Sequence, residues 1–280
     1  MTKAFGLATV ALVLTAAVVS AQERLTVGGA GSMVPLMQEL AKGYQSKQPQ
    51  DTIAIVPGTL GSTGGIKATE AGRLGMGLTG RPLKPEEKGR LVHHRLGVMP
   101  VVIAVHADVP VASLTQAQLC AIYSGQARSW KDVGGPDMKI VPLTRNEDDS
   151  DKEALRQHVG CYRDLRESSD VMVLTKGSEM IVGLAARPGA IGLTTSTIAE
   201  RSQGRLKAVA LDGVTPTPEA VRKGTYRLIK EFAVVTPGPP QGASKRFLDF
   251  VASLDGRQIM TQMGLVAESD AGGSSGRAPR

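Results

Sequence analysis

The chain contains few aromatic residues, few histidines and only two cysteines. Phe, Tyr and Trp make up 3% of its 280 residues, so we expect hydrophobic cores of aliphatic side chains and methionine. The four histidines include no pair at the helical i, i+4 spacing, and no carboxylate-rich metal motif surrounds them. The sequence therefore predicts no metal site and no cofactor.

Basic residues are in excess but are not clustered. The formal net charge is +7, yet Lys and Arg are scattered, without an Arg-rich arm or interleaved aromatic residues. This pattern indicates a solvated basic surface, and we expect no nucleic-acid partner. The two cysteines, Cys120 and Cys161, are a disulfide candidate if the compartment is oxidising, and two buried free thiols are an equal alternative.

The N-terminus has the pattern of a secretory signal peptide. Lys3 precedes the apolar run from Ala4 to Val19, and small residues at Val19-Ser20-Ala21 suit cleavage. An uncleaved membrane anchor is the alternative, but the run is short for a membrane span and no second span follows. The sequence thus predicts a signal peptide over residues 1–21 and a periplasmic or secreted protein.

Strand and helix patterns alternate along the mature chain, which predicts an α/β fold with a largely parallel sheet. Two apolar segments, near Gly97 to Ala107 and Gly189 to Thr197, are interpreted as crossovers between two lobes. We expect one final helix from Ser244 to Met263. The predicted division is lobe one at residues 22–100 plus 198–267, lobe two at residues 101–197, and a disordered tail at residues 268–280.

Three segments combine glycine or arginine with Ser or Thr at the expected start of a helix. These segments are Gly29-Ala30-Gly31-Ser32, Gly61-Ser62-Thr63-Gly64-Gly65, and the stretch from Arg145 to Ser150. A helix start offers unpaired N–H groups and the positive end of the helix dipole, and glycine allows close approach of a ligand. Together they predict a cradle for a small oxyanion.

Enzyme motifs are weak by comparison. The spacing at Gly29 and Gly31 lacks the third glycine of a dinucleotide-binding loop, because Val34 stands there. No histidine or metal base is recognisable beside Ser32 or Ser62. We therefore expect a binding protein and not an enzyme.

Several motifs resemble those of periplasmic phosphate-binding proteins, the substrate receptors of bacterial phosphate ABC importers. The resemblance follows family order over nearly the whole mature chain. Its lobe-two signature is Leu119-Cys120-Ala121-Ile122-Tyr123-Ser124-Gly125 followed by Trp130-Lys131-Asp132-Val133-Gly134-Gly135. The other matching segments are the first two glycine-serine segments above, Arg81-Pro82-Leu83-Lys84-Pro85-Glu86-Glu87, Ala190-Ile191-Gly192, Gly224-Thr225-Tyr226 and Phe247-Leu248-Asp249-Phe250.

The resemblance implies a type II periplasmic binding protein fold, with two α/β lobes, a hinge and an interlobe cleft that closes on a desolvated oxyanion. It implies a monomer that captures phosphate and delivers it to an ABC importer permease. The ligand-binding residues that it implies are Ser32, Met33, Ser62, Thr63, Gly64, Arg81, Arg145, Asp149, Ser150 and Asp151.

Two departures from the family pattern leave the ligand open. Gly80 stands where the family places an Asp that accepts the proton of monohydrogen phosphate. The acidic stretch before Ser150 is also unusual, since carboxylates near an anion are unfavourable unless they accept a proton or pair with Arg. Asp149 or Asp151 is a candidate for the missing acceptor. Sulfate, molybdate or an organic phosphate are alternative ligands, and an oxyanion sensor without a transporter or a weak phosphatase are alternative functions.

Overall fold

The structure is a computed structural model, and it describes residues 23–58 and 60–267. The predicted signal peptide and the predicted tail lie outside these residues. Within the described ranges, no helix is long and apolar enough to cross a membrane.

Strands and helices alternate in the first third of the chain and again in the middle, as the sequence predicts. The strands are β1 (Arg24–Gly29), β2 (Thr52–Ile55), β3 (Met76–Thr79), β4 (Val92–His106), β5 (Ser113–Leu114), β6 (Val141–Arg145), β7 (Met172–Leu174), β8 (Ala190–Thr195), β9 (Leu206–Leu211), β10 (Ile229–Thr236) and β11 (Val266–Ala267). The α-helices are α1 (Val34–Lys47), α2 (Gly61–Glu70), α3 (Gln116–Tyr123), α4 (Ser150–His158), α5 (Gly177–Ala186), α6 (Ser196–Glu200), α7 (Pro218–Arg222), α8 (Gly242–Ala252) and α9 (Leu254–Gln262). The short 3-10 helices are η1 (Gly31–Met33), η2 (Pro85–Glu87), η3 (Trp130–Val133) and η4 (Gly160–Tyr162).

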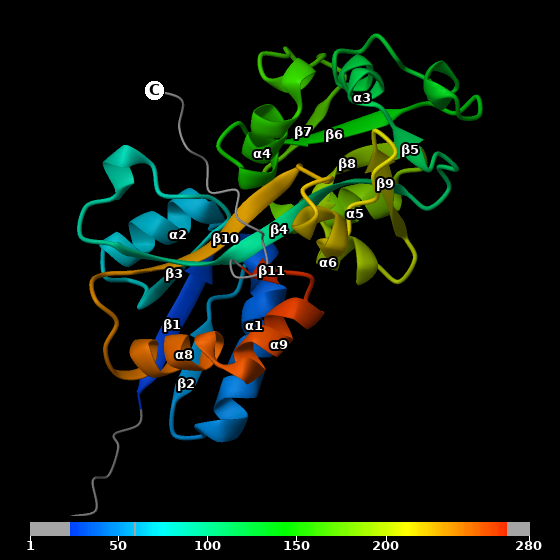
Figure 1. The fold of residues 1–280 in the computed structure, drawn as a ribbon. Helices are drawn as coiled ribbons and strands as arrows, with labels where there is room; N and C mark the ends of the chain where they lie inside the picture. Colours follow the sequence, from blue (N-terminus) through cyan, green and yellow to red (C-terminus); the bar gives the residue numbers. More distant parts are fainter. Residues whose placement is uncertain (1–22, 59, 268–280) are drawn as a thin grey trace, which may run out of the picture.

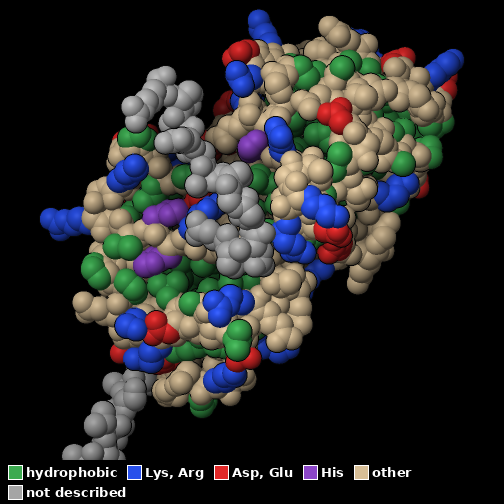
Figure 2. All heavy atoms as spheres, in the orientation of Figure 1, with side chains coloured by type: hydrophobic (Ala, Val, Ile, Leu, Met, Phe, Trp, Pro, Cys, Tyr) green, Lys and Arg blue, Asp and Glu red, His purple; other side chains and the backbone are tan. Residues whose placement is uncertain are grey.

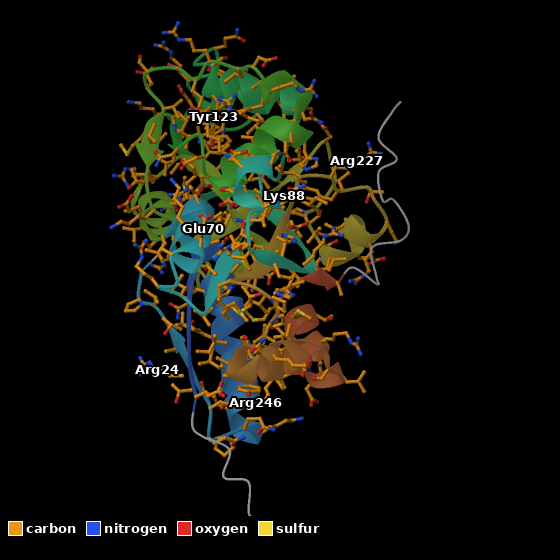
Figure 3. All side chains as sticks on the ribbon, turned by 90° about the vertical axis from the view of Figure 1, so that its left-hand side faces the viewer. Arg24, Glu70, Lys88, Tyr123, Arg227 and Arg246 are labelled. Carbon is orange, nitrogen blue, oxygen red and sulfur yellow. A yellow bond between two sulfur atoms is a disulfide. The ribbon has the colours of Figure 1, made fainter. Side chains whose placement is uncertain are left out.

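The molecule has two lobes that share one curled sheet (Figure 1). In the first lobe, β2, β1 and β3 run parallel, and β10 joins them antiparallel to β3. In the second lobe, β8, β6 and β7 run parallel, and β8 and β9 pair antiparallel with β4. Parallel strands joined by helices place strand ends and helix starts on one side, where ligands bind in open α/β sheets. In Figure 3, Tyr123 marks the second lobe and Arg246 the first.

Strand β4 makes the first crossing between the lobes, as predicted. Its residues Val92 to Pro100 pair with β10, and its residues Val101 to Val105 pair with β8. The second crossing differs from the prediction at 189–197. Strand β8 stays in the second lobe, and the chain returns to the first lobe only at β10, because β10 is the strand that pairs with both β3 and β4.

The side-chain packing moves the predicted lobe boundary. One hydrophobic cluster joins residues 25–99 to residues 232–265, and it buries six methionines among aliphatic side chains. A second cluster joins residues between 98 and 228 to Val266, and it includes Val209, Val221 and Leu228, which were predicted to belong to lobe one. Val209 lies on β9, which hydrogen-bonds along β4, and Val221 lies on α7, which contacts β4. The Leu228 carbonyl oxygen accepts from the Val101 N–H at 3.0 Å.

The predicted final helix is two helices. Ser253 has an extended backbone and its side chain accepts a hydrogen bond from the Gly256 N–H, so it caps α9 where α8 ends. A serine at this position satisfies an otherwise unpaired N–H at a helix start, which favours a break over a continuous helix.

Two glycines allow α2 to lie close against the sheet. A Cβ atom on Gly65 would stand 2.7 Å from the Cα of Gly29 and 2.9 Å from the carbonyl oxygen of Leu78. Gly29 itself has a φ of +141°, which disfavours other residues. This close packing sets the position of the α2 start relative to β1.

The two cysteines form a disulfide within the second lobe. Cys120 lies in α3 and Cys161 in η4, with their Cα atoms 6.3 Å apart. This distance lies within the range that a disulfide can bridge. Of the two alternatives left open by the sequence, the disulfide is the one present.

We predict that the Cys120→Ala/Cys161→Ala variant unfolds at lower urea concentration than the unmodified protein. The cross-link closes a loop of 41 residues, for which the chain-entropy relation gives about 4 kcal/mol of stabilisation. The measurement is the free energy of unfolding from urea titration, with the unmodified protein reduced by dithiothreitol as a control. Equal unfolding midpoints for the variant and the oxidised protein would contradict the prediction.

Candidate functional site

A cavity of about 280 Å³ lies between the lobes, beside the strand β10. The starts of four helices contribute to its lining. Gly31 and Ser32 come from η1, Gly61 and Ser62 from α2, Ser150 and Asp151 from α4, and Gly177 and Ser178 from α5. Its other lining residues are Ala30, Val34, Pro35, Gly58, Arg145, Asp149, Met180, Ile181, Leu193, Thr194, Ile198 and Lys230.

The N-cap residues of α1, α2 and α5 are Met33, Leu60 and Lys176, and the side chains of these three residues make no capping hydrogen bond. At the start of α5, the Glu179 carboxylate accepts from the Lys176 N–H at 3.0 Å. Helix α4 is capped by Asp149, whose Oδ1 accepts from the Asp151 N–H at 3.0 Å. N–H groups in the first turn of a helix can donate to a ligand, and the helix dipole favours a negative charge there.

Lys230 enters the cavity from β10 and is buried, with only 2% of its side chain exposed. Its Nζ donates to Ser32 Oγ at 2.9 Å and to Ser150 Oγ at 3.4 Å, and it pairs with Asp151. Ser32 belongs to the first lobe and α4 to the second. Lys230 therefore contacts both sides of the cavity.

Arg145 brings a second cation to the cavity at the end of β6. Its Nη1 donates to the Leu174 carbonyl oxygen at 2.8 Å and its Nη2 to Asp149 Oδ2 at 2.8 Å. The Arg145 Nε is buried and has no hydrogen-bond partner. A buried guanidinium N–H without a partner is costly, so this atom is a donor available to a ligand.

The acidic stretch is largely neutralised by cations of the protein. Asp149 pairs with Arg145, Asp151 with Lys230, and Glu147 with Lys152 and Arg156. The Arg156 hydrogen bond lowers the pKa of Glu147 to about 2. Burial raises the pKa of the Asp151 carboxyl, and the Lys230 ammonium acts in the opposite direction. These pairs relieve the repulsion that the stretch would otherwise impose on an anion.

The structure places six of the ten predicted ligand-binding residues on the cavity: Ser32, Ser62, Arg145, Asp149, Ser150 and Asp151. The other four do not line it. Met33 is fully buried in the core of the first lobe. Thr63 faces Arg81, since its Oγ1 accepts from Arg81 Nη2 at 3.1 Å, and Gly64 is packed near the Leu60 side chain.

Arg81 does not line the cavity, and it pairs with carboxylates of both lobes. Its Nη1 and Nη2 each donate to the Glu87 carboxylate at 2.7 Å, and its Nε lies 3.7 Å from Glu153 Oε2 in α4. The pairing with Glu87 was not predicted, although Glu87 lies only six residues further along the chain. The Arg81 guanidinium holds the pKa of the Glu87 carboxyl below its usual range.

Sequence analysis also missed Gly177, Ser178 and Lys230. The first two repeat the glycine-serine pair of Gly31-Ser32 and Gly61-Ser62 at a helix start, so a search for that repeat finds them. Lys230 has no comparable signal, because a lysine in an apolar strand is read as solvent-facing until its neighbours are known.

On one face of the molecule, the basic side chains do not form a single patch (Figure 2). On the face shown in Figure 2, Lys and Arg are scattered among acidic and apolar side chains. In the part of the chain that the structure describes, no cluster of three or more His, Cys, Asp or Glu residues is placed to hold a metal ion.

A family model described as a PBP superfamily domain matches residues 15–255. The chain belongs to the PBP superfamily. Phosphate-binding protein PstS of Bacillus subtilis (strain 168) is 26% identical over 251 residues, which covers 88% of this chain and 81% of that protein. Phosphate-binding protein PstS of Borreliella burgdorferi is 21% identical over 250 residues, covering 86% of this chain and 89% of that protein.

Solved structures show the same fold. A crystal structure with bound phosphate from Clostridium perfringens, assigned as a phosphate ABC transporter substrate-binding protein, matches with a TM-score of 0.79 and 27% identity. The match covers 87% of this chain and 99% of the Clostridium perfringens chain. An ABC-type phosphate transport receptor from Vibrio cholerae matches with a TM-score of 0.66 and 26% identity, covering 86% and 99%. The fold is that of a type II periplasmic binding protein, as the sequence predicts.

We predict that Arg81→Met lowers the stability of the protein and leaves anion binding nearly intact. The side chains of Arg81 and Glu87 are 5% and 13% exposed, and loss of one partner of a buried pair costs about 3 kcal/mol or more. Because Arg81 lowers the folded-state pKa of Glu87, the pair stabilises above the unfolded pKa of about 4.3. Its contribution disappears as the pH falls through the folded-state pKa.

Urea unfolding at neutral and acid pH measures this effect, and Arg81→Met/Glu87→Gln is the matched control. The double variant should regain part of the stability, since the buried position 87 then carries no charge that lacks a partner. If Arg81→Met had normal stability and a large loss of anion affinity, the result would contradict the prediction and show that Arg81 contacts the anion.

Proposed function

We propose that this protein captures phosphate in the interlobe cavity and presents it to an ABC importer. The observation that carries the proposal is the cavity itself, which combines several helix starts, serine hydroxyls and the buried Arg145 Nε, for which the described residues provide no hydrogen-bond partner. Such a set of donors in one desolvated space suits a small oxyanion. The names of the similar proteins support phosphate as that oxyanion.

We assign the anion contacts to Ser32, Ser62, Arg145 and Ser150, with backbone N–H groups at the starts of α1 and α2. Two-lobed folds with a hinge between the lobes close around their ligand. Closure would remove the anion from water and strengthen each charge-assisted contact.

The location and partner follow from the same proposal. The signal-peptide pattern of residues 1–21 supports export to the periplasm. The disulfide between Cys120 and Cys161 supports an oxidising compartment. The partner would be the permease of an ABC importer, because the similar solved proteins are named as components of ABC-type phosphate transport. The protein would act as a monomer.

The hydroxyl contacts favour binding over catalysis. A nucleophilic serine needs a base that accepts its proton. Here the Lys230 Nζ donates to Ser32 and Ser150, and the Gly80 N–H donates to Ser62 Oγ at 3.0 Å. These partners cannot accept a proton from the hydroxyl. A phosphatase assay with a metal chelator present tests the alternative function, a weak phosphatase.

We predict that Arg145→Met weakens phosphate binding more than Ser62→Ala. Loss of the neutral Ser62 donor should cost about 1–3 kcal/mol, whereas a buried cation that contacts an anion contributes more. Isothermal titration calorimetry with inorganic phosphate measures both effects, and thermal unfolding without phosphate checks that each variant folds. Unchanged affinity in both variants would show that the anion binds elsewhere.

We also propose that Asp151 accepts the proton of monohydrogen phosphate. Both oxygens of Asp149 have partners, because Oδ1 caps α4 and Oδ2 pairs with Arg145. Among the described residues, Lys230 binds only Oδ1 of Asp151, so Asp151 is the better placed of the two carboxylates. Asp151→Asn should weaken phosphate binding while sparing or improving sulfate binding, because sulfate carries no proton at neutral pH. Competition calorimetry with both anions measures the ratio, and an equal effect on both would exclude this role.

A further inference from the structure

The buried ammonium of Lys230 has as many protein partners as it has hydrogens. An ammonium has three donors and no acceptor. Within residues 23–58 and 60–267, its partners are Ser32 Oγ, Ser150 Oγ and the Asp151 carboxylate. Removing a cation from water is costly unless such partners are present, so this arrangement is what allows Lys230 to be buried.

The contacts with the two serines also fix the direction of their hydroxyl groups. A hydroxyl has one hydrogen and two lone pairs, and Lys230 can only donate. Ser32 and Ser150 must therefore use a lone pair toward Lys230, and their hydrogens stay free for another acceptor. In the described part of the chain, neither hydroxyl donates to a protein group, and both serines line the cavity.

We propose that Lys230 is a positioning residue that makes Ser32 and Ser150 hydrogen-bond donors toward the anion. The proposal rests on the anion-binding function above. Hydroxyls in general can donate or accept. In Ser32 and Ser150 the ammonium occupies one lone pair of each hydroxyl, so the hydroxyl hydrogen points away from Lys230 and is available to an anion whose oxygens accept.

Lys230 orients the hydroxyl of one serine in each lobe. Ser32 lies in η1 beside the core of the first lobe, and Ser150 begins α4 in the second. The ammonium thus orients donors on both walls of the cavity from the strand that crosses between the lobes. An anion bound between the walls would meet both hydroxyls already oriented, which lowers the cost of ordering them on binding.

Ser62 provides a matched control for this role. It lines the same cavity, but its Oγ accepts from the Gly80 N–H at 3.0 Å and not from Lys230. Loss of the Lys230 ammonium should therefore release Ser32 and Ser150 and leave Ser62 oriented. A general loss of positive charge would instead weaken the contribution of all three hydroxyls alike.

Double-mutant cycles on the full mature chain test the proposal, with inorganic phosphate as the probe in calorimetry. Lys230→Met should weaken phosphate binding, and Lys230→Arg should restore much of it. In the unmodified protein each serine-to-alanine change should raise the Kd about tenfold. In the Lys230→Met background, Ser32→Ala and Ser150→Ala should each raise it less than about threefold, while Ser62→Ala keeps its full effect.

Additive effects for all three serines, or unchanged phosphate binding in Lys230→Met, would overturn the proposal. If Lys230→Met leaves Asp151 unpaired and fails to fold, the same cycles are measured with Asp151→Asn present in every protein. Failure of the unmodified protein to bind phosphate would overturn the proposed function, and the role of Lys230 with it. Normal phosphate binding with additive cycles would overturn the role of Lys230 alone.

Discussion

The antiparallel pairing of β4 with β10 is the constraint on which the rest of the molecule depends. It runs from Ile229 opposite Pro100 to Thr236 opposite Val92, and it joins the strands of both lobes into one sheet. The cavity lies beside this pair, so its walls belong to different lobes while its position is fixed by backbone hydrogen bonds. The hinge between the lobes consists of β4 and β10. Residues on these two strands stay paired when one lobe moves relative to the other.

Charge balance in the cavity explains how an acidic stretch can stand beside an anion site. Arg145 is paired with Asp149 and Lys230 with Asp151, so the buried cations are compensated when no ligand is bound. We propose that binding depends on directed donors more than on excess charge. The helix starts, the Arg145 Nε and the serine hydroxyls of the cavity are the donors that this proposal uses.

Local patterns in the sequence were sufficient for most of the secondary structure and for three helix starts at the site. The alternation of apolar strands with amphipathic helices, and the glycine-serine pairs before helices, depend on residues only a few positions apart. The resemblance to the phosphate-binding family is confirmed by the comparisons. Ser253 is a local signal too, but a helix cap inside an apolar pattern is easily read as a continuous helix.

Tertiary structure alone decided which side chains meet at the cavity. Lys230 contacts Ser32 across 198 residues of sequence, and no pattern near either residue indicates this contact. Arg81 pairs with Glu87 because η2 brings the carboxylate to it, and this removes Arg81 from the predicted site. The sequence by itself determined the elements and the class of ligand, since both rest on short-range chemistry. Burial and long-range pairing determined which cations and hydroxyls line the cavity, because only the packed chain removes them from water and satisfies their hydrogen bonds.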